Sequence, residues 1–134
     1  MRFALLLLLA SCGGDSTPQC EAEPGVSAEM CERTPEAIAV VRQAFFDYGY
    51  TLPWRPGVVW HKGRCVEMWG DRCIYGMQRP ECRIHVAADW GFTWGSVFSH
   101  ELMHCVVSDR AHDDVGSQYV AQVIARERLI ELGF

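Results

Sequence analysis

The sequence predicts an α+β domain in which a short twisted sheet packs on a histidine-bearing helix, with one helix before the sheet and another at the C-terminal end. Three observations lead to this class. Apolar residues repeat with helical spacing in 34–49, short β-rich runs fill 51–89, and two more helical segments follow. Because helices and strands occupy separate runs, we expect α+β rather than alternating α/β architecture. A chain of 134 residues suffices for one compact domain.

The N-terminal residues have the features of an export signal. A positive charge precedes the apolar run 3–10, which is shorter than the roughly 20 residues of a membrane span. Residues 9–12, LASC, resemble the lipobox of bacterial lipoproteins. The resemblance implies a signal peptide over 1–11, lipidation of Cys12 and an exported protein anchored by lipid to the cell envelope. Gly13 in place of aspartate favours the outer membrane, and a plain signal peptide cleaved nearby is the alternative.

Residues 12–33 are small and polar, and they predict a tether that leads to a folded domain over 34–134. Six cysteines remain after Cys12, and an even number in a small exported chain predicts disulfides. We expect a local Cys20–Cys31 pair, with the other four tying the central strands to each other and to the helix that carries the last cysteine. The six are Cys20, Cys31, Cys65, Cys73, Cys82 and Cys105.

The folded elements can be taken in order. Thr34 followed by Pro35 is a typical helix start, and Gly49 ends that helix. In the last β-rich run, Ile84 and Val86 should face the core, with the intervening residues facing away. The β-rich runs are 57–63, 65–70, 73–78 and 82–89, and the later helices are expected at 93–107 and 115–131.

The segment HELMH, residues 100–104, carries the chemistry. His100 and His104 are four residues apart, so on a helix they lie on one face and can bind one ion together. Glu101 lies beside that face, where a carboxylate can act on a water without ligating the metal. The opposite face is apolar and should pack on the sheet through Phe98, Leu102 and Val106.

This motif, on a helix preceded by an edge-like strand, resembles the zincin metallopeptidases over residues 81–130. The resemblance implies Zn²⁺ bound by His100 and His104, with Glu101 as the general base. It also implies that the preceding strand, 82–87, pairs with an extended peptide substrate. The expected activity is therefore hydrolysis of peptide bonds by a membrane-anchored zinc metallopeptidase.

The sequence offers several candidates for the third zinc ligand. We expect His112, because imidazole binds zinc well and this residue follows the motif closely. Glu127 is the rival, since gluzincins take a glutamate from a later helix and this carboxylate falls within an apolar stripe. Asp113 and Asp114 are weaker alternatives. The stripe consists of Tyr119, Val120, Val123, Ile124 and Ile130.

The amino-acid composition limits the kinds of partner that we expect. The net charge is −5 with no basic run, which argues against nucleic acid. We expect a monomer that acts on a peptide or protein and touches the membrane through its lipidated N-terminus. His85 is a candidate for lining the cleft, and His85, Tyr119 or an arginine for stabilising an oxyanion. Two alternatives stay open: a non-catalytic zincin-like lipoprotein that binds metal or a partner, and an envelope protein whose histidines bind no metal.

Overall fold

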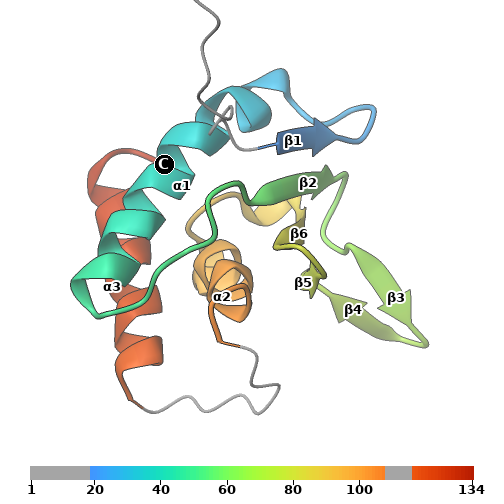
Figure 1. Cartoon of the computed structure of the whole chain (residues 1–134). Coiled ribbons are helices and arrows are strands. Elements are labelled where there is room, and N and C mark those ends of the chain that lie inside the picture. The colour runs from blue at the N-terminus through green and yellow to red at the C-terminus, as the bar shows by residue number, and fades with distance from the viewer. Residues whose placement is uncertain (1–18, 108–115) are drawn as a thin grey trace, which may run out of the picture.

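The computed structural model describes residues 19–107 and 116–134 and confirms the α+β class. A four-stranded sheet has the order β1-β2-β6-β5, and a separate hairpin, β3–β4, projects from it (Figure 1). The strands are β1 (Gln19–Ala22), β2 (Gly57–His61), β3 (Glu67–Trp69), β4 (Arg72–Ile74), β5 (Gly76–Arg79) and β6 (Arg83–Ala87). The α-helices of the described residues are α1 (Ala28–Asp47), α2 (Val97–His104) and α3 (Ser117–Glu131).

The position of β6 corrects one expectation. Strands β1, β2 and β6 are parallel, and β5 pairs antiparallel with β6 on the side away from β2. The strand at 82–87 is therefore a central strand with both edges occupied, so it cannot pair with a substrate. Among the described strands, β5 is the sheet edge next to α2, where it has a neighbour on one side only.

The core lies between one face of the sheet and the helices (Figure 1). Ile84 and Val86 are both fully buried, which confirms the alternation predicted for β6. From β2, Trp60 stacks on Phe98 of α2 at 5.8 Å between ring centroids. This contact seats the histidine-bearing helix directly against the centre of the sheet.

Helix α1 begins six residues earlier than predicted. Its N-cap is Ser27, whose hydroxyl accepts from the backbone N–H of Glu29 at 3.3 Å. Thr34, predicted to cap the helix, is instead fully buried, where its hydroxyl accepts from Trp60 Nε1–H at 3.0 Å. Pro35 lies inside the helix rather than at its first turn. The pattern was misleading because the hydroxyl of Thr34 accepts the hydrogen bond of the buried Trp60 indole and does not cap the start of the helix.

The folded domain also begins earlier in the sequence than the predicted residue 34. Of the residues predicted to form a tether, 19–22 are strand β1 of the main sheet and 28–33 belong to α1. The disulfide prediction is confirmed: the bonds are Cys20–Cys31, Cys65–Cys73 and Cys82–Cys105. The first joins β1 to α1, the second closes the β3–β4 hairpin, and the third ties the start of β6 to the end of α2.

Helix α3 presents a different face from the one predicted. Its buried residues are Ala121, Ala125 and Leu129, whereas Tyr119 and Ile130 are 48% and 43% exposed. Small alanines let α3 approach α1 and α2 closely, and Leu129 is the large side chain that α3 buries fully. In the described residues, none of the helices combines the length and apolar character that a membrane span needs.

Candidate functional site

Helix α2 is a short helix that carries the predicted site residues. It begins at Val97, later than the predicted residue 93, because Gly95 and Ser96 have φ values of 54° and 59°, which α-helical backbone does not allow. It ends at His104, with Cys105 as the C-cap. Phe98 and Leu102 are fully buried against the sheet, as predicted, and this packing fixes the rotation of the helix.

The two histidines of the motif face one another. His100 Nε2 and His104 Nε2 are 3.1 Å apart. Two nitrogens bound to one tetrahedral zinc ion at 2.0–2.1 Å would be about 3.3 Å apart. The distance between the two Nε2 atoms is therefore close to the one that a shared zinc ion requires. Both rings are half-buried.

Gln122 of α3 orients the first histidine. His100 Nδ1 lies 3.0 Å from Gln122 Oε1, so an Nδ1–H donated to this oxygen leaves the lone pair of His100 on Nε2. The same residue is held in place, because Ser99 Oγ–H donates to the Gln122 carbonyl at 3.2 Å. Gln122 thus fixes the orientation of the His100 ring.

Glu101 is enclosed between α2 and β5. It is 7% exposed, and burial raises the pKa of its carboxyl to about 7. A Cβ added at Gly76 would lie 2.9 Å from Glu101 Cγ and 2.8 Å from Val97 Cγ1. Only glycine at this point of the edge strand allows the carboxylate to lie against the β5 backbone.

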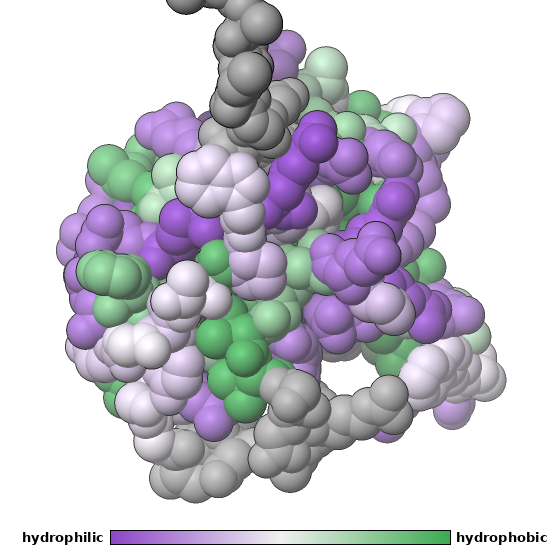
Figure 2. Space-filling view, in the orientation of Figure 1, coloured by the Kyte–Doolittle hydropathy of each residue, from purple (hydrophilic) through white to green (hydrophobic). Residues whose placement is uncertain are grey.

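Two adjacent hollows open on this carboxylate. One, of about 600 Å³, lies between the hairpin strand β4 and α2 and includes His100 in its lining. The other, of about 380 Å³, follows β5 and includes His104. Ile74, Gly76 and Glu101 line both, so the two hollows meet at the carboxylate. Figure 2 shows this face hollowed between the helices and the hairpin, with hydrophilic residues over much of the surface.

The other predicted site residues fall into two groups. His112, Asp113, Asp114 and Cys12 lie outside the described residues. Glu127 is described, and its side chain is 52% exposed and ion-paired with Arg126 at 3.0 Å. The argument that made Glu127 a rival ligand, its place on a buried face, is therefore wrong. Within 19–107 and 116–134, no three His, Cys, Asp or Glu side chains gather in a way that could hold a metal.

His85 does not line the hollows. Its neighbours Ile84 and Val86 face the helices, so His85 projects from the opposite face of the sheet, where it contacts His61. Arg72, from β4, is the arginine that lines the larger hollow.

Sequence reasoning missed two residues of the candidate site, Gly76 and Gln122. A glycine inside a β-rich run often marks a close backbone approach, so Gly76 carried a usable signal. Gln122 carried none, because only the packing of α3 on α2 brings it to His100. Comparison of the chain with protein-family models, curated proteins and solved structures finds no match.

Proposed function

We propose that this protein is a zinc-dependent peptidase held at the bacterial cell envelope by a lipidated Cys12. One observation carries the proposal: two imidazole Nε2 atoms lie 3.1 Å apart beside a buried carboxylate that borders two open hollows. This combination matches the roles that the zincin resemblance implies for His100, His104 and Glu101.

The donor set suits zinc. His100 and His104 would hold the ion, with His112 as the expected third ligand. A bound zinc ion supplies Lewis acidity, which polarises a carbonyl group and makes water more acidic. The remaining chemistry belongs to the protein. Glu101 would take a proton from the attacking water and return it to the leaving amine, and a pKa of about 7 suits both transfers near neutral pH.

The edge strand suggests how a peptide would be held. Among the described strands, β5 pairs with a neighbour on one side only, and it runs past Glu101 at Gly76. An extended peptide added to this edge would form backbone hydrogen bonds with β5 and cross both hollows. The substrate strand is thus β5, in place of the strand at 82–87 that the sequence suggested.

Glu101→Gln tests the assigned role, because glutamine keeps the size of the side chain but cannot accept a proton from water. We expect cleavage of a peptide library to fall by at least about a hundredfold while zinc content stays at the wild-type value. Glu67→Gln, on the exposed hairpin strand β3, is the matched control and should cleave normally. Cleavage by the Glu101 variant at the wild-type rate would remove the residue from the mechanism.

A non-catalytic role in binding metal or a partner protein is the second candidate. The β3–β4 hairpin favours it, because Met68 and Trp69 are 53% and 60% exposed, and exposed apolar side chains often mark a binding surface. Cleavage assays with and without a chelator separate the two. Chelator-sensitive cleavage supports the peptidase, whereas zinc binding without any cleavage supports the binding protein.

A further inference from the structure

An arginine borders the larger hollow of the proposed peptidase site. Arg72 belongs to β4, and the lining of this hollow of about 600 Å³ also includes His100 and Glu101. Arg72 and Ile74 are two residues apart on the strand, so their side chains leave the same face of the hairpin. Because Ile74 lines both hollows, the side chain of Arg72 leaves β4 on the side where the hollows lie.

The backbone under Arg72 is fixed by covalent and hydrogen bonds. Cys73, the next residue, forms a disulfide with Cys65 that closes the β3–β4 hairpin. At the end of the same strand, the backbone N–H of Val66 donates to the Ile74 carbonyl at 2.7 Å. The strand is therefore ordered before a ligand binds, which lowers the entropy lost on binding.

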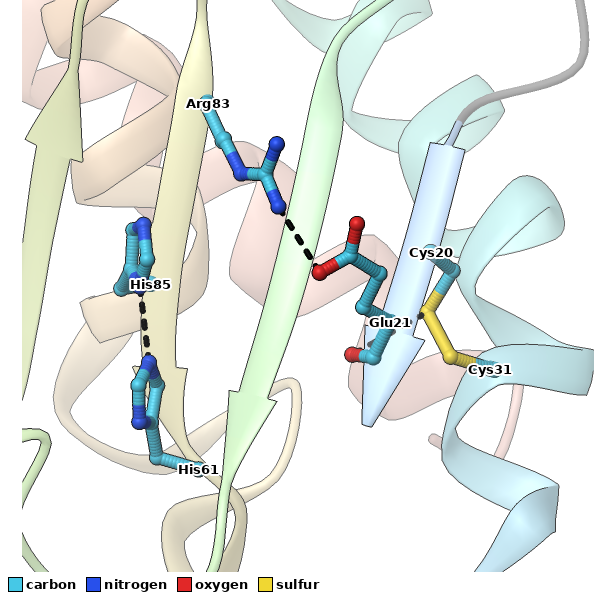
Figure 3. A network of polar contacts seen from close by, with 6 residues as sticks. All are labelled: Cys20, Glu21, Cys31, His61, Arg83 and His85. Atoms are coloured by element: carbon cyan, nitrogen blue, oxygen red, sulfur yellow. Dashed lines mark hydrogen bonds and ion pairs between the residues drawn. A yellow bond between two sulfur atoms is a disulfide. The ribbon is translucent and has the colours of Figure 1, made fainter. Parts of the chain in front are cut away.

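The positive charge of Arg72 is not neutralised by a neighbouring side chain. Arg83, on the outer face of the sheet, is turned toward Glu21, with 2.8 Å between Arg83 Nη2 and Glu21 Oε2 (Figure 3). Arg126 and Arg128 also form ion pairs. Within 19–107 and 116–134, by contrast, the side chain of Arg72 forms neither an ion pair nor a hydrogen bond. Its guanidinium is always charged, so its N–H donors are available to a ligand.

A guanidinium of this kind is suited to a carboxylate, because its planar fork matches the two carboxylate oxygens. Among the described residues, Glu101 is the one acidic side chain that lines either hollow, and the proposed function assigns it to proton transfer. The carboxylate must therefore come from the ligand. The net charge of −5 does not oppose this strongly, since physiological salt screens exposed charges beyond about 8 Å.

An aromatic surface borders the same hollow. Tyr75 belongs to its lining and is 41% exposed. The ring of Tyr75 meets Trp90 and Trp94 edge to face, with 5.5 Å between the ring centroids in each case. Trp90 and Trp94 stack on one another at 3.8 Å, and Trp94 is 44% exposed. These rings offer apolar contact to the carbon atoms of a substrate whose carboxylate reaches Arg72.

We propose that Arg72 is a specificity-determining residue that binds a carboxylate of the peptide substrate in the larger hollow, beside Glu101. This inference rests on the proposed peptidase function and names the substrate class of that site. The carboxylate belongs either to an acidic side chain or to the C-terminus of the peptide, since a guanidinium recognises the same group in both. An exposed ion pair contributes modestly, so we expect a preference of about fivefold.

Peptide binding to the untagged mature protein tests the inference. Nuclear magnetic resonance titrations in chelator exclude a metal that could itself bind a carboxylate. Three acetylated alanine pentapeptides are compared: central glutamate with an amidated C-terminus, central glutamine with an amidated C-terminus, and central glutamine with a free C-terminus. We expect a carboxylate-bearing peptide to bind about fivefold more tightly than the amidated glutamine peptide. Preference for the first peptide identifies an acidic side chain as the ligand, and preference for the third identifies the chain end.

Substitutions assign the preference to one side chain. Arg72→Gln should abolish it, and Arg72→Glu should replace it with a preference for an amidated peptide with central lysine. Arg83→Gln, which removes an arginine from the outer face of the sheet, should leave the preference within twofold. Circular dichroism confirms that each variant is folded. Equal or undetectable binding of the three peptides to the wild-type protein, or a preference that survives Arg72→Gln, would overturn the proposal.

Cleavage of the same peptides in the presence of zinc is measured separately, so that the two proposals can fail independently. A carboxylate preference without cleavage would support the contact with Arg72 and contradict the peptidase. Cleavage without a carboxylate preference would support the peptidase and overturn the contact.

Discussion

Glu101 is the residue whose environment departs most clearly from that of an ordinary surface carboxylate. It lies between α2 and the edge strand with 7% of its surface exposed, and burial raises its pKa to about 7. A carboxylate in water ionises well below this value, so part of the folding energy holds Glu101 in place. Such a cost is expected where a carboxylate has a chemical role rather than a structural one.

This burial predicts a pH dependence for the metal-free protein. The pKa of Glu101 is higher in the folded than in the unfolded chain, so the folded state binds the proton more tightly. Its contribution to stability is present below the unfolded value of 4.5 and is lost as pH rises to about 7. Glu101→Gln should therefore raise the unfolding free energy at pH 8 by about 3 kcal/mol at most and do little at pH 4. Urea unfolding at both pH values, in chelator, checks this. An equal effect at both would contradict it.

Gln122 yields a second prediction at this scale. If it orients His100, Gln122→Ala should lower zinc affinity about tenfold or more, whereas Gln122→Glu keeps an acceptor for Nδ1–H and should retain it. Gln118→Ala, one turn earlier on α3, is the control. Competition with a zinc-sensitive dye measures the affinities. Equal affinity in all variants would show that the contact does not prepare the ligand.

At the residue scale, local spacing predicted only what lies within one helix. His100, Glu101 and His104 come together because an α-helix repeats every 3.6 residues, which the sequence shows directly. Gln122 is 22 residues from His100, and its contact depends on how α3 packs. Glu127 was placed on a buried face because large apolar residues suggested one. The alanines that α3 buries are weaker signals of burial.

Among the elements, the contact between α2 and β5 decides the shape of the site. Gly76 brings the strand backbone against Glu101 and Val97, with no room for a side chain. The helix α2 and the edge strand β5 are therefore closely packed. The distance between them sets the shape of the two hollows that Gly76 lines.

Gly76→Ala should disrupt this packing. The added methyl group would lie 2.8 Å from Val97 Cγ1, so the helix or the strand must shift. We expect a loss of about 1–3 kcal/mol in stability, as for overpacking elsewhere, and at least a tenfold loss of cleavage. Gly57→Ala is the matched control, because its nearest atom would be Arg83 Cγ at an ordinary 3.6 Å. Thermal melts and peptide cleavage measure both effects. Equal behaviour of the two variants would count against the close packing.

The sequence predicted the type of most helices and strands better than it predicted where each one begins and ends. The β-rich runs, the alternation in β6 and the helix that carries the motif all follow from local periodicity. Strand order did not follow, because β1, β2 and β6 pair in parallel through contacts between residues far apart in the sequence, which no local pattern encodes. The start of α1 was missed for a similar reason. Thr34 looked like a cap, but a tryptophan 26 residues away occupies its hydroxyl.

For the molecule as a whole, the three disulfides hold the main elements together. The six cysteines of the domain form three disulfides, which join β1 to α1, close the β3–β4 hairpin and tie β6 to the end of α2. Cys82–Cys105 is the most informative bond, because it fixes the end of α2 to the start of β6. The helix that bears both histidines is thus attached covalently to the centre of the sheet.

The zinc content of the untagged mature protein tests the central claim most directly. The protein is equilibrated with zinc, dialysed against metal-free buffer and analysed by mass spectrometry of the elements. We predict one zinc per chain, lost in His100→Gln and His104→Gln but retained in His61→Gln and Glu101→Gln. A folded wild-type protein that leaves dialysis without stoichiometric zinc, or one whose zinc survives both ligand substitutions, would contradict the account.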